Sequence, residues 1–275
     1  MKNLFCITLL LFVFIAKAQY YYKDLMAAAD ITLQMKIYTN NNIHQVTSTG
    51  YTPNGVTSSA FNETREVDYK NMLFKIITMV NQARSSVIYK FNDHGKLQSL
   101  EDSSTGMISK SNYLYDKDGK LVEISNVISD SSQDFTQTEV HLWIYNQDKP
   151  EKMWRIINKT DSLEVRFKTD ELGNIIEEQN FKKGKGSDPL YYYYDTKNRL
   201  TDIVRYNTKA KRLLPDFMFE YDDQNRVIQK ITTLSNLNLG YLTWRYLYDE
   251  KGLKTKEALF NKEKQIQGRI DYSYN

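Results

Sequence analysis

The feature of this sequence that most restricts its fold is a turn pattern that recurs every 24 to 30 residues. An Asp or Asn opens each turn, because its side chain can accept a hydrogen bond from the backbone two residues on. Three residues later, six of the seven turns carry Gly or Asn, which adopt a left-handed backbone at low cost. The third turn instead has Lys149 and Pro150. The openers are Asn92, Asp116, Asn146, Asp170, Asp195, Asp222 and Asp249, and the left-handed positions are Gly95, Gly119, Gly173, Asn198, Asn225 and Gly252.

Aromatic residues precede these turns at fixed positions, one and three residues before the opener. Residues two apart on an extended strand point to the same face, so each pair marks one face of a strand. The fourth unit keeps only Phe167, and the chain stops after Tyr272 and Tyr274, which supply the opening strand of an eighth unit. We expect that strand to pair with an earlier one. The pairs are Tyr89/Phe91, Tyr113/Tyr115, Trp143/Tyr145, Tyr192/Tyr194, Phe219/Tyr221 and Tyr246/Tyr248.

These residues resemble the YD-repeat (RHS-like) family, whose units read roughly Y-x-Y-D-x-x-G-R-L. The matching segments are YLYDKDGKL from Tyr113, YYYDTKNRL from Tyr192, FEYDDQNRV from Phe219 and YLYDEKGL from Tyr246. The resemblance covers residues 87–275, with Asn in place of two glycines, Lys for one Arg and two degenerate units. It implies an array of hairpins. It says little about activity, because the family uses such arrays as shells, scaffolds and surface-binding modules.

The N-terminus has the pattern of a secretory signal peptide over residues 1–18. A basic residue, Lys2, precedes an apolar run, and Ala16-Lys17-Ala18 is a small-x-small cleavage site. Cleavage after Ala18 would leave Gln19 first. A lipoprotein would need cysteine there, and the sole cysteine, Cys6, lies in the apolar run. We therefore predict an exported protein, periplasmic or extracellular, that is not a lipoprotein and has no disulfide.

Residues 19–86 differ from the repeat and form a predicted N-terminal segment that packs on the array of residues 87–275. Leu25 to Ala29 favours helix, although Ile31, Leu33, Met35 and Ile37 alternate with polar residues as a strand would. We favour a helix that ends near Asn40. A hairpin over 43–56 and beyond follows, and residues 73–80 read as a strand rather than a helix.

These elements predict a mainly β fold, a large antiparallel meander of about 15 or more strands with a short N-terminal helical segment. Open twisted sheets rarely exceed about 10 strands, so the sheet should curl into a half-pipe or a barrel. Between the paired aromatics stand both apolar residues such as Leu114 and charged ones such as Glu220. A strand face that carries both apolar and charged residues is typical of a surface in contact with water, so we expect a protein that does not span a membrane.

Candidate chemistry is sparse. His44, His94 and His141 lack metal-ligand spacing, and the calcium-loop-like Asp116-Lys117-Asp118-Gly119 is explained by the turn. Glu177 and Glu178 are neighbours on a strand, so they should face opposite sides and form no dyad. With 37 basic and 34 acidic residues, a nucleic-acid partner is not indicated. We predict no cofactor, no metal and no catalytic residues.

The aromatic residues are the remaining functional candidates. Those at repeat positions are better explained as core, but Tyr191 and Tyr193 must point opposite to Tyr192 and Tyr194. The candidate ligand-binding residues are Tyr191, Tyr193, Trp143, Trp154 and Trp244. The leading hypothesis is a non-enzymatic exported protein that binds a glycan or a protein partner at the cell envelope. The alternatives are a polysaccharide-acting hydrolase with carboxylates in the concave face, and a passive shell or immunity-type protein.

Overall fold

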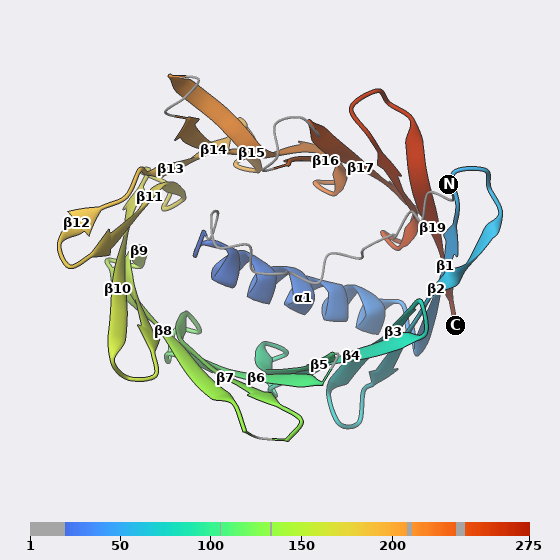
Figure 1. Cartoon of the computed structure of the whole chain (residues 1–275), viewed down its shortest axis with the longest axis horizontal. Coiled ribbons are helices and arrows are strands. Elements are labelled where there is room, and N and C mark those ends of the chain that lie inside the picture. Colours follow the sequence, from blue (N-terminus) through green and yellow to red (C-terminus); the bar gives the residue numbers. More distant parts are fainter. Residues whose placement is uncertain (1–19, 105, 133, 208–210, 235–239) are drawn as a thin grey trace.

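The computed structural model describes residues 20–104, 106–132, 134–207, 211–234 and 240–275, so the predicted signal peptide lies outside the described residues. It contains one helix and a single sheet of 19 strands (Figure 1). The elements are α1 (Lys23–Asn40), β1 (Gln45–Tyr51), β2 (Thr57–Asp68), β3 (Leu73–Val80), β4 (Ala83–Phe91), β5 (Leu97–Ser104), β6 (Met107–Tyr115), β7 (Leu121–Asp130), β8 (Thr136–Asn146), β9 (Lys149–Ile157), β10 (Asp161–Thr169), β11 (Ile175–Lys182), β12 (Lys185–Gly186), β13 (Leu190–Tyr194), β14 (Leu200–Asn207), β15 (Arg212–Tyr221), β16 (Val227–Thr233), β17 (Tyr241–Tyr248), β18 (Lys254–Phe260) and β19 (Ile266–Tyr274).

The sheet curls, as predicted, and of the two forms left open by the sequence, a half-pipe or a barrel, it takes the closed antiparallel barrel. Strands that follow one another in sequence pair with one another, and β1 pairs with both β2 and β19. Val46 thus lies opposite Arg65 on one side and Tyr274 on the other. The short strands β12 and β13 both pair with β11 and together complete one position in the wall. The last half-unit of the repeat therefore pairs with the first hairpin, which removes both free edges of the sheet.

The corners adopt the expected left-handed backbone. Asn198 and Asn225 have φ values of 64° and 63°, like the glycines at the equivalent positions. In these six corners the opening side chain accepts backbone hydrogen bonds, as Asp195 does from the N–H of Lys197 (2.9 Å) and Arg199 (3.0 Å). The third unit uses a tighter turn, with positive φ at both Gln147 and Asp148. This turn explains why that unit lacks the Gly or Asn.

Successive units interlock through the Tyr and the Arg or Lys of the motif. The hydroxyl of Tyr221 donates to the Leu200 carbonyl (2.7 Å), while Arg199 donates to the Asp222 carbonyl (2.9 Å) and lies 4.8 Å from the Tyr221 ring centre. Tyr248 and Arg226 repeat this arrangement one unit later. Each unit thereby satisfies backbone carbonyls of its neighbour, so the motif residues serve the wall of the barrel.

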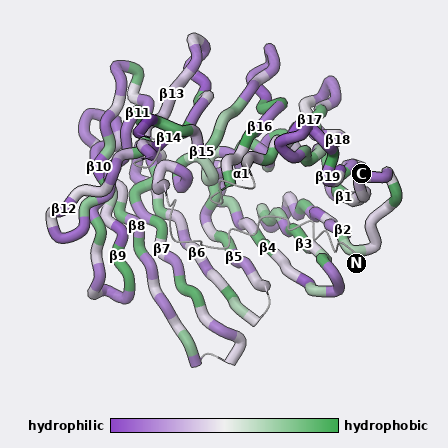
Figure 2. The backbone as a smooth tube through the Cα atoms, turned by 45° about the horizontal axis from the view of Figure 1, so that its top comes forward, coloured by the Kyte–Doolittle hydropathy of each residue, from purple (hydrophilic) through white to green (hydrophobic). Residues whose placement is uncertain are grey.

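The paired aromatics and the aliphatic residue that follows each Gly or Asn corner face the lumen. Two clusters of buried residues fill it, one around the first helix turns and one around the C-terminal half of the helix. Hydrophilic residues gather at the hairpin ends, whereas hydrophobic and hydrophilic residues alternate along many strands (Figure 2). Of the residues that follow the corners, Leu97, Leu121, Ile175, Leu200 and Leu253 are buried.

Helix α1 lies across the lumen, enclosed by the ring of strands (Figure 1). Met35 and Tyr38 are buried against the wall, whereas Leu33 is 55% exposed. The alternating apolar residues of 31–37 therefore lie in a helix and do not form a strand. Packing against the wall, rather than a strongly amphipathic sequence, stabilises this helix. The hairpin and the strand at 73–80 are confirmed, and both belong to the barrel wall itself. Among the described residues, no helix has the length and apolar character needed to cross a membrane.

Candidate functional site

The N-terminal end of α1 is held by a buried carboxylate from the wall. Glu178 of β11 is 1% exposed and accepts hydrogen bonds from the backbone N–H of Tyr21 (2.8 Å) and Tyr22 (3.0 Å). It also accepts one from the hydroxyl of Tyr192 (2.8 Å). Burial raises the pKa of Glu178 to about 7, although these three hydrogen bonds act in the opposite direction. Glu178 thus caps a helix that has no side-chain cap of its own.

One turn further along, a charged cluster links the helix to strand β8. His141 Nδ1 lies 2.6 Å from Asp24 Oδ2, and its Nε2 lies 2.8 Å from Glu139 Oε1. Ionised carboxylates only accept hydrogen bonds, so both ring nitrogens must carry a proton and the imidazole is cationic. Burial lowers the pKa of His141, but the two carboxylates outweigh it and raise it to about 9. Arg155 of β9 also binds Glu139, at 2.6 Å.

A third polar group secures the C-terminal end of the helix. Glu63 of β2 is buried and accepts hydrogen bonds from Ser48 (3.1 Å), Thr78 (3.1 Å) and Arg65 (2.8 Å). Arg65 in turn reaches the hydroxyl of Tyr38 at 3.5 Å. The helix is therefore tied to the wall by polar contacts near both ends, and each contact is buried or half-buried.

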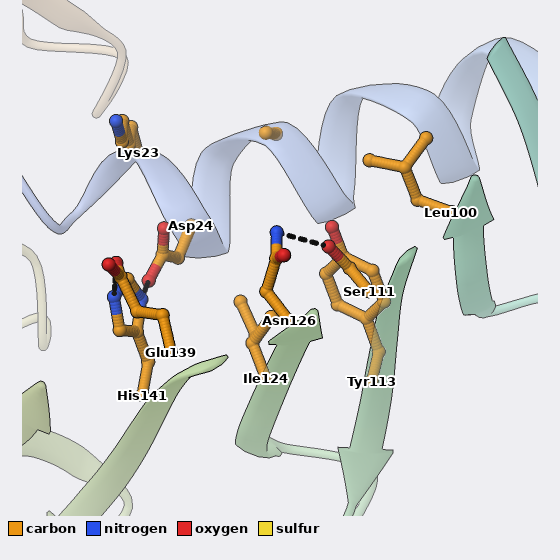
Figure 3. A pocket seen from close by; sticks show the side chains of 10 residues that line it. Lys23, Asp24, Leu100, Ser111, Tyr113, Ile124, Asn126, Glu139 and His141 are labelled. Atoms are coloured by element: carbon orange, nitrogen blue, oxygen red, sulfur yellow. Dashed lines mark hydrogen bonds and ion pairs between the residues drawn. The ribbon is translucent and has the colours of Figure 1, made fainter. Parts of the chain in front are cut away.

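Between α1 and strands β5–β8 lies a pocket of about 280 Å³ (Figure 3). Apolar atoms of Ala27, Leu100 and Ile124 form much of its wall, with the ring of Tyr113. The polar lining residues are Lys23, Asp24, Ser111, Asn126, Glu139 and His141. Because Ala27 is exposed, the pocket reaches solvent beside the helix. We call this space the lumenal pocket.

The acids of the lumenal pocket are poorly placed for glycoside hydrolysis. That reaction needs one carboxyl that can give a proton and a second that is free to act as base or nucleophile. Here Asp24 and Glu139 both accept hydrogen bonds from His141. Burial raises the pKa of Glu139, but its own hydrogen bonds and charge interactions with His141 and Arg155 outweigh burial and lower this pKa to about 2. No tryptophan lines the pocket. In the described part of the chain, no group of three His, Cys, Asp or Glu side chains could hold a metal ion.

The aromatic candidates from the sequence are divided between the two faces of the wall. Tyr192 is buried, while Tyr193 is 48% exposed on the outer face and Tyr191 is half-buried there. Trp143 is buried and stacks on Phe167, with ring centres 5.0 Å apart, so its ring belongs to the core and cannot form a binding surface. Trp244 lies on the same face as the inward Tyr246, beside Leu259.

Trp154 is on the outer face, because its neighbours in register are Glu164 and Leu142 whereas buried Met153 faces the lumen. Phe181, which the sequence argument did not single out, lies opposite Glu164 on the same face, with Arg166 4.2 Å from its ring centre. Tyr191 lies opposite Glu177, which pairs with Lys168 at 2.8 Å. We call Trp154, Phe181, Tyr191 and Tyr193 the aromatic outer face.

Sequence reasoning missed the lumenal pocket. The spacing of His141 indicates no metal site, and nothing local in the sequence groups it with Asp24, Glu139, Ser111 and Tyr113. One signal was present: residue 141 stands two before the inward Trp143, so it shares the inward face of β8. Its partner Asp24 could not be found in this way, because it belongs to the helix, 117 residues away.

The class of protein that these features define is a closed antiparallel β-barrel with its N-terminal helix inside the lumen. No family model matches the chain, and no curated protein matches it.

Three solved structures show distant similarity. A porin-like protein from Bacteroides uniformis has 10% identity and a TM-score of 0.44, over 85% of this chain and 98% of that one. A porin-like protein from Bacteroides vulgatus has 13% identity and a TM-score of 0.28, over the same shares of the two chains. The Photorhabdus luminescens Tc holotoxin pore has 14% identity and a TM-score of 0.35, over 78% of this chain and 12% of that one. Similarities this weak assign neither a family nor a function.

Proposed function

We propose that this chain is an exported, non-enzymatic protein of the cell envelope, built as a divergent YD-repeat (RHS-like) array, that binds a glycan through its aromatic outer face. Export is supported by the signal-peptide pattern of residues 1–18. The family assignment is supported by the corner and Tyr–Arg arrangement that its motif produces here. The observation that carries the binding proposal is the outward position of Tyr191, Tyr193 and Trp154 on one side of the barrel.

The composition of this face suits sugar rings better than a dry protein interface. Aromatic rings offer apolar area at low entropic cost, while the charged groups between them can hydrogen-bond hydroxyls. Arg166, Lys168 and Glu177 lie between Trp154 and Tyr191 on the outer face of β10 and β11. A protein interface of ordinary size is depleted of Lys and Glu at its centre.

The hydrolase alternative receives less support, because Asp24 and Glu139, the two acids that line the lumenal pocket, are both bound to His141. A passive shell would leave the outward rings without a role, and no contact in the structure favours an immunity-type protein.

The test is binding of the full exported chain to a glycan array and to insoluble envelope polysaccharide. Replacing Trp154, Tyr191 and Tyr193 together by Ala should weaken glycan binding by roughly tenfold or more, because each ring supplies a large apolar contact. The matched control is Tyr241→Ala, which removes a 40% exposed tyrosine from the distant strand β17. If no glycan is retained, or the triple variant binds like the control, the proposal is wrong. Capture of an envelope protein alone would assign the face to a protein partner and would also reject it.

A further inference from the structure

A second pocket, of about 190 Å³, lies on the outer face of strands β16–β18. It faces outward because its residues on β16 and β17 alternate with inward ones such as Trp244 and Tyr246. The turn between β18 and β19 also contributes to its lining. We call this space the outer pocket, and its main lining residues are Gln229, Ile231, Thr243, Arg245, Phe260 and Lys264.

The outer pocket offers hydrogen-bond donors that the described residues leave unused. Arg245 donates from Nε to Gln229 Oε1 at 3.0 Å, and it forms no ion pair with any described carboxylate. Thr243 is only 9% exposed, yet its hydroxyl has no hydrogen-bond partner within the described ranges. Gln229 pairs in register with Arg245, and Thr243 stands two residues from Arg245 on the same face. An acceptor placed over these strands therefore meets donors from both Arg245 and Thr243.

Lys264 brings a second positive charge to the outer pocket. It stands three residues after Asn261 in a corner of the same form as those of the repeat, in which the Gln265 N–H donates to Asn261 Oδ1 at 2.9 Å. Lys264 has a left-handed φ of 62°, at the position where six corners of the repeat carry Gly or Asn. Its side chain is exposed and has no carboxylate partner in the part of the chain that the structure describes. The turn thus holds a cation beside the pocket that no described acid neutralises.

The carboxylates around the outer pocket do not cancel both of these charges. Glu220 of β15 lies opposite Gln229 on the outer face, so strand β16 separates it from Arg245, and it does not line the pocket. Arg245, Lys264 and Glu220 together leave one net positive charge. Three further carboxylates of the neighbouring strands and turn have cationic partners: Glu263 with Lys262 (3.8 Å), Asp216 with Arg205 (2.6 Å) and Asp271 with Arg269 (2.8 Å). The outer pocket therefore favours an anion.

The remaining lining is apolar and the space is small. Ile231 and Phe260 lie on either side of Thr243 in register, and the guanidinium carbon of Arg245 is 5.3 Å from the Phe260 ring centre. At about 190 Å³, the pocket is below the range for drug-sized ligands, roughly 300–1,000 Å³. The ligand must be small and must combine an anionic group that accepts several hydrogen bonds with a flat apolar body.

We propose that the outer pocket binds a small phosphate monoester with a flat apolar body. The phosphate accepts hydrogen bonds from Arg245, Lys264 and Thr243, and the body packs on Phe260 and Ile231. A phosphate monoester offers three terminal oxygens and a charge of about −1.5 to −2 at pH 7, whereas a carboxylate offers two oxygens and a single charge. Two cations and a hydroxyl match the phosphate better.

This proposal is independent of the glycan proposal. The outer pocket lies on β16–β18, whereas the aromatic outer face lies on β9, β11 and β13. Tyr241 also lines the outer pocket, and Tyr241→Ala remains a valid control for glycans that carry no phosphate.

The experiment is calorimetric titration of the full exported chain at pH 8 with phenyl phosphate, phenyl sulfate and phenol. Phenyl phosphate should bind, and phenyl sulfate should bind at least roughly fivefold more weakly because it carries one negative charge instead of two. Phenol, which is uncharged, should bind more weakly still. These three probes share the apolar ring and differ in the group that meets the cations.

Two variants test the residues. The double variant Arg245→Gln/Lys264→Asn should weaken phenyl phosphate binding by roughly tenfold or more, because it removes both cations, and Asn suits the left-handed corner at 264. Thr243→Val removes the hydroxyl, keeps the shape of the side chain and should weaken binding by roughly threefold.

The matched control is Lys251→Gln/Lys256→Gln, which removes two positive charges from exposed lysines that do not line the pocket. This control, and the triple variant of the aromatic outer face, should bind phenyl phosphate as the unmodified chain does. The proposal is overturned if phenyl phosphate does not bind, if phenyl sulfate or phenol binds as tightly, or if the double variant binds like its control. Retention of the chain on vesicles that contain phosphatidic acid, without binding of phenyl phosphate, would assign the pocket to a lipid headgroup and would also reject the proposal.

Discussion

The cationic His141 makes the stability of the barrel depend on pH. Its side chain is only 10% exposed and is held between Asp24 and Glu139, which raise its pKa from 6.5 to about 9 against the opposing effect of burial. The folded chain therefore keeps a proton that the unfolded chain releases. This contribution to stability is fully present below pH 6.5 and is lost as the pH rises through about 9.

The size of the effect follows from the shift. At about 1.4 kcal/mol per pKa unit, the change from 6.5 to about 9 corresponds to about 3 kcal/mol between pH 6 and pH 10. Glu178 also has a raised pKa, but its contribution is present below about 4.5 and is lost as the pH rises through about 7. Most of the His141 contribution is therefore lost at a higher pH than the Glu178 contribution.

The assay is urea unfolding at half-unit steps from pH 6 to pH 10, for the unmodified chain and for His141→Gln. The difference in free energy of unfolding between the two should shrink by about 3 kcal/mol across this range, because only the unmodified chain loses the His141 contribution. An NMR titration of the His141 ring gives the pKa directly. A pH-independent difference, or a ring that titrates near 6.5, would refute the reasoning.

Two further predictions concern the helix anchor and the corners. Glu178→Ala should lower the free energy of unfolding by about 2–4 kcal/mol, because the N–H groups of Tyr21 and Tyr22 lose a charged acceptor. The control Glu177→Ala, on the outer face, should cost under about 1 kcal/mol. Equal losses for the two variants in chemical denaturation would contradict the role of Glu178 as a helix anchor. Asn198→Val should lower the free energy of unfolding by about 1–2 kcal/mol, because residue 198 has a φ of 64°, whereas Asn198→Gly should be neutral or stabilising. A higher melting temperature for the Val variant than for the Gly variant would show that this corner is not strained.

The motif residues that made the repeat recognisable contribute to the wall rather than to a site. Asp195 holds its corner, Asn198 turns the chain, Arg199 reaches the next corner and Tyr221 returns a hydrogen bond to Leu200. The buried Glu178 and His141, whose pKa values are raised, lie elsewhere, where the non-repeating helix meets the wall. The candidate pocket therefore lies at the contact between the two kinds of sequence.

Local chemistry in the sequence was enough to predict the corners, the inward and outward faces and the large antiparallel sheet. These features depend on the left-handed backbone of Gly and Asn and on the two-residue period of a strand. Both act within a few residues, so they can be predicted without knowledge of tertiary contacts. The same period separated Tyr191 and Tyr193 from Tyr192 and Glu177 from Glu178. The helix at 23–40 was predictable only against a competing strand pattern over 31–37.

Only the tertiary structure decided that the barrel closes and that the helix lies inside it. Closure depends on β1 meeting β19 across more than 200 residues, and the pocket depends on Asp24 reaching His141 over a separation of 117. Such contacts form because the curled wall must bury its aromatic face and the helix must satisfy its N-terminal N–H groups. The local sequence does not show which residue meets either requirement, since any inward position of the wall could have supplied the contact.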